Sequence, residues 1–186
     1  MSSSDQIALA LLNQLLAGER GIVPLQLAML LEKSARLARG DEASQVAADY
    51  KDILLPELAG ISITPQISEE IITHLCSAVS NDPDQALISV AAATGTRPAI
   101  KTLVKVLVVP PRALKLDELT VAFSCLSTFL PIYCSESPDF ISREEVASLS
   151  KLAEGVLSSG ESGGSVAENT AVREQAARLI DRLQRG

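Results

Sequence analysis

Five cations grouped between positions 85 and 115 are the residues whose type and spacing could do chemistry. Arg97, Lys101, Lys105, Arg112 and Lys115 occur there without one acidic residue, although the 186-residue chain has a net charge of −7. On a helix, Arg97, Lys101 and Lys105 fall one turn apart in a stripe. The stripe can bind an acidic partner, or its lysines can solvate the edge of the core. We treat the five cations as candidate partner-binding residues.

Catalytic and metal-binding patterns are weak. His74 is the only histidine, and its place on the expected helix puts it on the solvent side while Cys76 points inward. A metal shared by these two residues is therefore disfavoured. The acidic pairs at 69–70 and 144–145 lie in first helical turns, where negative charge offsets the helix dipole. We expect no enzyme activity, no cofactor and no metal.

An apolar helix must position the basic stripe. Ile100, Leu103, Val104, Leu107 and Val108 recur at the spacing of a helix that buries one face. Pro98 suits its first turn, and the prolines at 110–111 end it.

The same periodicity, interrupted by Gly and Pro, predicts nine helices. They begin near residues 5, 24, 41, 68, 83, 98, 116, 142 and 166. Ser4, Ser68 and Asp82 are expected N-caps, and Ser142 with Glu145 has the spacing of a capping box. Pro56 should bend or end the third helix. The composition of residues 158–165 predicts a flexible loop.

Composition favours an all-α protein with a single domain over residues 1–186. Hydrophobic residues make up 47% of the chain, but aromatic residues only 3%, with no Trp, which suits helix packing better than a β-sandwich. The best apolar window, Leu119–Cys134, is 16 residues long and contains Pro131, so we expect a buried helix and no membrane partner. The three cysteines fit reduced thiols, and the first residues lack a secretory pattern, which predicts a cytoplasmic or nuclear protein.

Charge alternates in sign along the chain. Residues 41–84 contain nine acidic side chains against one lysine, and residues 116–161 contain eight against two basic side chains. These blocks can pair with the basic stretch between them or steer a charged ligand. The acidic total argues against nonspecific DNA binding by the whole surface. Nucleic-acid or phosphate binding through the basic helix at 97–115 stays an alternative.

A resemblance appears in the last helix. Residues 169–183 read Asn-Thr-Ala-Val-Arg-Glu-Gln-Ala-Ala-Arg-Leu-Ile-Asp-Arg-Leu. This segment resembles the second helix of a HEAT repeat, in which a Val-Arg pair starts the inner helix, paired alanines allow close approach and leucines fill the core. The aspartate usual at that family's turn is Asn169 here.

Two expectations follow for architecture and function. Nine helices in 186 residues give roughly 40 residues per pair, the period of helical-hairpin solenoids. We expect stacked antiparallel hairpins in a HEAT/armadillo-like superhelix, with a compact helical bundle as the alternative. The resemblance implies a non-enzymatic scaffold or adaptor, which would bind a protein segment, with an acidic stretch as the expected partner.

Overall fold

The computed structural model describes residues 1–160 and 164–185, and every regular element in these ranges is a helix. The all-α prediction is confirmed. The ten helices are α1 Ser3–Leu16, α2 Val23–Ala38, α3 Ala43–Tyr50, α4 Pro56–Ala59, α5 Pro65–Asn81, α6 Gln85–Thr94, α7 Arg97–Val108, α8 Leu116–Glu136, α9 Arg143–Ser158 and α10 Val166–Arg185. Part of the loop expected at 158–165, residues 161–163, lies outside the described residues.

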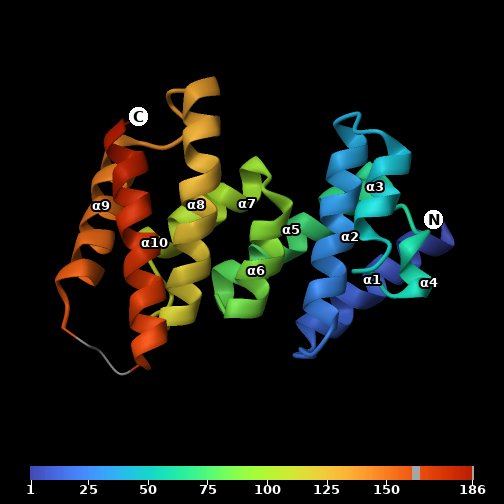
Figure 1. Ribbon diagram of the computed structural model, residues 1–186, viewed down its shortest axis with the longest axis horizontal. Helices are drawn as coiled ribbons and strands as arrows, with labels where there is room; N and C mark the ends of the chain where they lie inside the picture. The colour runs from blue at the N-terminus through green and yellow to red at the C-terminus, as the bar shows by residue number, and fades with distance from the viewer. Residues whose placement is uncertain (161–163, 186) are drawn as a thin grey trace.

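The long helices form two rows that run along the molecule (Figure 1). Helices α1, α5, α7 and α9 contact one another in that order and form the first row. Helices α2, α6, α8 and α10 do the same and form the second row. Consecutive helices pack across the rows, α1 on α2, α5 on α6, α7 on α8 and α9 on α10. The chain therefore stacks pairs of helices in chain order, with α3 and α4 inserted beside α2.

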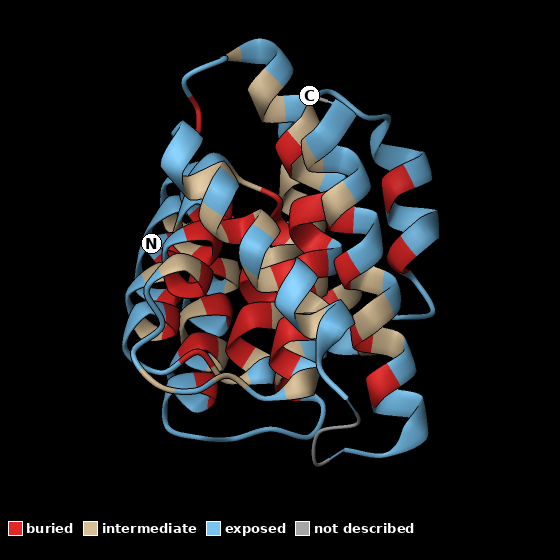
Figure 2. Ribbon diagram, turned by 90° about the vertical axis from the view of Figure 1, so that its left-hand side faces the viewer, coloured by how far each residue is buried: buried red, intermediate tan, exposed pale blue. Residues whose placement is uncertain are grey.

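The core lies between the two rows. Figure 2 shows buried residues concentrated in the interior and exposed residues on the outer faces. α8 contributes Phe123 and Leu126, both fully buried, and α7 contributes Ile100 and Leu103. α8 is also long and apolar enough to cross a membrane by length and composition, but here it packs against α6, α7 and α10. Leu126 is therefore among the most buried residues of the described chain.

The α3–α4 insertion is tied to α2 by buried polar side chains. Lys33 Nζ donates to the carbonyl oxygens of Ala59 at 2.8 Å and Ile61 at 2.9 Å. Gln26 Nε2 donates to the carbonyl of Ile53, and its Oε1 accepts the Leu55 N–H at 2.9 Å. These bonds satisfy backbone groups of a connector that has little regular structure of its own. Burial lowers the pKa of Lys33.

Three expected N-caps were wrong. Ser2, and not Ser4, caps α1, because Asp5 then occupies the third helical position and accepts the Ser2 N–H. Thr64 caps α5 and allows Pro65 to fill the first turn, so Ser68 lies inside that helix. Asp84, and not Asp82, caps α6, and its side chain accepts the Leu87 N–H at 2.9 Å. The capping box of Ser142 and Glu145 is confirmed.

Two prolines act differently from the sequence expectation. The third helix already ends at Tyr50, and Pro56 begins the short helix α4. The sequence favours an end of the helix that begins near residue 116 before Pro131, near Leu130, but Pro131 lies inside α8, which continues to Glu136. A proline inside a helix costs about 3 kcal/mol, but the next turn carries Tyr133, whose ring packs 5.1 Å from that of Phe140 and 6.4 Å from that of Phe129. This aromatic packing offsets the lost backbone bond.

Gly95 ends α6 at a site where only glycine fits. Its φ of 57° is left-handed, and a Cβ there would collide with the ring of Phe129. Replacing Gly95 with alanine should therefore lower the free energy of unfolding by about 1–3 kcal/mol. Gly60 ends α4 with φ of −87° and open space around it, so Gly60→Ala is the matched control. Equal denaturation midpoints for the two variants would contradict this account.

Candidate functional site

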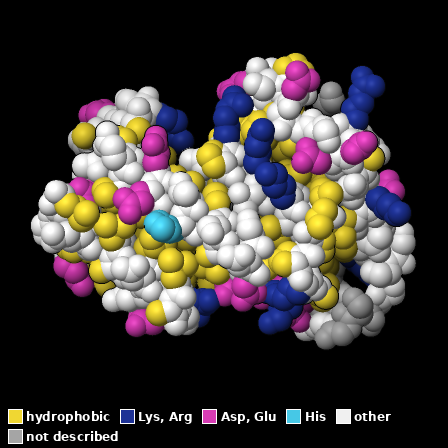
Figure 3. Space-filling model, turned by 180° about the vertical axis from the view of Figure 1, so that it is seen from behind, with side chains coloured by type: hydrophobic (Ala, Val, Ile, Leu, Met, Phe, Trp, Pro, Cys, Tyr) yellow, Lys and Arg dark blue, Asp and Glu magenta, His cyan; other side chains and the backbone are white. Residues whose placement is uncertain are grey.

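The basic stripe lies on the exposed side of α7, in the first row. Arg97, Lys101 and Lys105 are all exposed, whereas Ile100 and Leu103 are buried beneath them. Figure 3 shows Lys and Arg side chains grouped near the middle of this face. The geometry expected for these three residues is therefore found.

Arg97 also has partners within the chain. Its Nη2 lies 2.5 Å from Glu136 Oε2, and its guanidinium lies 4.8 Å from the ring centroid of Tyr133 and 5.5 Å from that of Phe140. Lys101 Nζ lies 5.2 Å from the same Phe140 ring. These cation–π contacts join the start of α7 to the end of α8 and the loop before α9. Arg97 and Lys101 thus have a structural role alongside any binding role.

Arg112 and Lys115 lie apart from the stripe, around the first turn of α8. Arg112 donates from Nη1 and Nη2 to both carboxylate oxygens of Glu118, at 2.9 and 2.8 Å, and from Nε to Asp82 Oδ1 at 2.9 Å. The Lys115 N–H donates to Glu118 Oε2 at 2.7 Å. Burial alone would raise the pKa of Glu118, but the bonds from Arg112 and Lys115 together hold it below its usual value. Arg112 is therefore committed to an internal ion pair.

The structure also contains a groove that sequence reasoning missed. Three cavities follow one another along the second row, between α2 and α6, between α6, α8 and α10, and between α8 and α10, with volumes of about 630, 390 and 230 Å³. Ala93 lines the first two cavities, and Ser124, Thr128 and Gln175 line the last two. Because neighbouring cavities share wall residues, they adjoin one another in a line across four helices, and we call this line of cavities the second-row groove.

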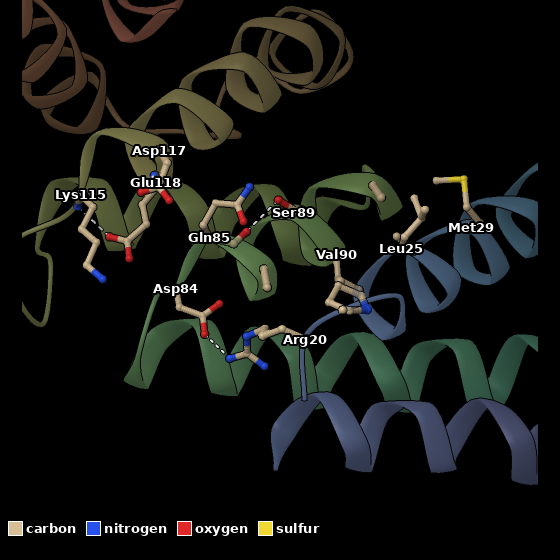
Figure 4. Close-up of a pocket in the computed structure, with 15 residues that line it drawn as sticks. Arg20, Leu25, Met29, Asp84, Gln85, Ser89, Val90, Lys115, Asp117 and Glu118 are labelled. Carbon is tan, nitrogen blue, oxygen red and sulfur yellow. Dashed lines mark hydrogen bonds and ion pairs between the residues drawn. The ribbon is translucent and has the colours of Figure 1, made fainter. Parts of the chain in front are cut away.

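The α2–α6 end of the groove is an apolar slot (Figure 4). Leu25 and Met29 of α2 face Val90 of α6 across it, and Leu25 is 50% exposed. Charged side chains stand at its rim: Arg20 pairs with Asp84 across the α1–α2 and α5–α6 turns, and Lys115, Asp117 and Glu118 line it from the start of α8. An apolar slot with a polar rim is typical of a site that receives a side chain of a partner.

The rest of the groove is polar and then basic. Ser124 and Thr128 are exposed along α8. Gln175 of α10 reaches between α8 and α10, and its Oε1 is buried without a hydrogen-bond donor within residues 1–160 and 164–185. At the α10 end, Arg178, Asp181 and Arg182 line the wall, and Asp181 pairs with Arg185 at 3.0 Å, which leaves the two arginines as the excess charge. The groove therefore changes from apolar to polar to basic along the row.

A weak signal for this groove exists in the sequence. Ala86, Ser89 and Ala93 on α6 recur at helical spacing, as do Thr120, Ser124 and Thr128 on α8. Both sets line the groove. Small residues at this spacing do not predict a groove until it is known which helices lie next to each other.

Among the residues that the structure describes, His74 and Cys125 do not lie in a second cluster of reactive side chains. His74 is exposed on α5, as expected, with its Nε2 4.0 Å from Glu70 Oε1. Burial raises the pKa of Cys125 to about 12, which makes this thiol a poor nucleophile. Across the described ranges, no group of three or more His, Cys, Asp or Glu side chains could hold a metal ion.

Comparison of the chain with protein-family models, with curated proteins and with solved structures gave no match. Function is therefore inferred from the groove and from the charges on the two rows.

Proposed function

We propose that this protein is a non-enzymatic scaffold that binds a segment of a partner protein in the second-row groove. The line of adjoining cavities carries this proposal, because neighbouring cavities share wall residues from α2 to α10. A site of this length and changing polarity suits a polypeptide better than a small molecule, which would occupy one enclosed cavity.

The order of the helices supports a HEAT/armadillo-like repeat as the scaffold. Each row is built from alternate long helices in chain order, as in helical solenoids. α10 belongs to the second row, and its Val172, Ala176 and Leu179 are buried. These are positions at which residues 169–183 resemble the inner helix of a HEAT repeat. In such solenoids the inner helices form the protein-binding surface.

An acidic stretch remains the expected feature of the partner. Two groups of cations could receive it: Lys101 and Lys105 on the first row, and Lys115, Arg178 and Arg182 along the groove. Lys101 and Lys105 have no salt bridge to any residue that the structure describes. Charge complementarity at either place would raise the association rate and make it sensitive to salt.

Nucleic-acid binding through residues 97–115 is less well supported. Affinity for a phosphate backbone depends on the number of cations that are free to contact it. Arg112 is paired with Glu118 and Asp82, and Arg97 with Glu136. Only Lys101, Lys105 and Lys115 are left without an ion pair to the residues described, and Lys115 lies apart from the other two.

Site-specific photo-crosslinking in the native cell tests the proposal. A photoreactive amino acid at Ser124 probes the groove, the same group at Lys101 probes the basic stripe, and Thr73, exposed on α5, is the control position. We expect a discrete polypeptide adduct from Ser124 and none from Thr73. An adduct from Lys101 alone would move the binding surface to the stripe. A nucleic-acid adduct, or no polypeptide adduct from either surface, would overturn the proposed function.

A further inference from the structure

We infer that the second-row groove selects an extended segment that carries a large apolar side chain about five to seven residues away from a carboxylate. This inference rests on the proposed function and names the chemistry of the ligand. It follows from three features of the groove: the apolar slot, the polar floor and the basic end.

The slot between α2 and α6 fits the apolar side chain. Its walls are Leu25, Met29 and Val90, with Ala86 leaving room between them. A leucine that is half exposed next to a methionine forms an adaptable apolar surface without a partner in the described chain. Filling the slot with an apolar side chain would remove Leu25 from water.

The floor of the groove fits a backbone. The α6 and α8 residues that line it are small, mainly Ala, Ser and Thr, so a main chain can approach closely. Gln175 Oε1 lacks a donor although it is buried. A buried acceptor of this kind normally has a partner. Rotation of the Gln175 side chain towards the groove would let this atom accept a backbone N–H of a bound segment.

The α10 end fits a carboxylate. Arg182 has no ion pair to the residues described, and Arg178 pairs only with Glu174, an exposed neighbour one turn away, at 2.8 Å. Such an exposed pair contributes little and exchanges readily. Two guanidinium groups on successive turns can hold a carboxylate through paired N–H donors.

The spacing follows from helix packing. The slot and the basic end are two helix-to-helix steps apart along the row (Figure 1), and each step is about 8–10 Å. An extended chain advances about 3.3 Å per residue. An extended chain therefore needs about five to six residues to cross the row from the slot to the basic end. The slot and the basic end also lie at different heights along the helix axes, and this difference adds about one more residue.

Selection from a random peptide display library on the full chain, followed by anisotropy titration of the enriched peptides, tests the inference. We expect enriched peptides to combine a large aliphatic or aromatic residue with Asp or Glu at this spacing. Leu25→Glu and the double variant Arg178→Glu/Arg182→Glu should each weaken binding at least about tenfold. The double variant should also remove most of the salt dependence of the affinity.

The controls carry the same changes on α9, outside the groove. Leu157→Glu replaces another exposed leucine, and Arg143→Glu/Lys151→Glu reverses two exposed cations; neither should change the affinity. Unchanged thermal midpoints would show that the groove variants remain folded. Peptides that bind but lack the pattern, or that bind both groove variants normally, would overturn this inference alone. No enriched peptide at all would overturn the proposed function as well.

Discussion

Replacing Leu126 with alanine is expected to lower the free energy of unfolding by about 2–5 kcal/mol. Leu126 is fully buried near the middle of α8, and α8 contacts α6, α7 and α10. Helices on several sides restrict how far the surroundings can collapse into the space left by the side chain. The variant therefore loses transfer free energy and keeps a cavity. Urea denaturation would measure the change, if the unfolding free energies of both proteins depend on urea concentration with the same slope.

Ile132→Ala provides the matched control on the same helix. Ile132 is 48% exposed, so its truncation should change stability by no more than about 0.5 kcal/mol. Equal losses of unfolding free energy in Leu126→Ala and Ile132→Ala would mean that helix propensity, and not enclosure of α8, determines the loss of stability. A stable Leu126→Ala protein would contradict the position of α8 at the centre of the stack.

The course of most helices could be predicted because burial repeats with the helical period. The pattern from Ile100 to Val108 gave the buried face of α7, and with it the exposed position of Lys101 and Lys105. The excess of apolar residues in α8 likewise indicated that it is enclosed on several sides. Both conclusions depend only on residues close together in the sequence.

Helix boundaries were harder to predict because distant residues decide between competing caps. Asp5 is buried, and its Oδ1 accepts the Thr64 N–H at 3.0 Å, from the turn before α5. The buried position of Asp5 favours Ser2 over Ser4 as the N-cap of α1. α8 passes Pro131 because Tyr133 packs on Phe140 and its hydroxyl donates to the Gly95 carbonyl. None of these partners is adjacent in the sequence. The local sequence therefore contains several possible capping residues and does not show which of them caps the helix.

The candidate site could be predicted only in part, for a similar reason. The stripe on α7 is a property of one helix, so its geometry was accessible. For Arg112, the sequence predicted only that the basic stretch could pair with the acidic blocks on either side. It did not identify Glu118 and Asp82 as the partners. The second-row groove requires the knowledge that α2 lies against α6, which follows it only after three other helices. The small residues on α6 and α8 line a groove only in that arrangement.

The second large effect is expected for Arg112→Met, which should lower the free energy of unfolding at neutral pH by about 2–4 kcal/mol. Methionine keeps much of the apolar stem but removes four hydrogen bonds, two of them to Glu118. The Glu118 side chain is only 2% exposed, so its charge would be left with the Lys115 N–H as its main support. Arg178→Met is the control, because Arg178 and its partner Glu174 are 62% and 56% exposed and their pair contributes at most about 0.5 kcal/mol.

The pH dependence distinguishes this ion pair from simple loss of packing. In the wild type the pKa of Glu118 lies below its usual value, so the pair stabilises the fold above the unfolded-state pKa, and that contribution is lost as the pH falls through the lower folded-state pKa. Without Arg112, burial should dominate and raise the pKa of Glu118, so that the folded variant binds a proton more readily than the unfolded chain. The difference in stability between wild type and Arg112→Met should therefore be largest near neutral pH. It should begin to shrink as the pH falls through the raised pKa of Glu118 in the variant, and continue to shrink until the pH has fallen through the lowered pKa in the wild type. Urea denaturation of both proteins across this range measures it, and a difference that stays constant with pH would show that Arg112 acts through packing and not through the charge of Glu118.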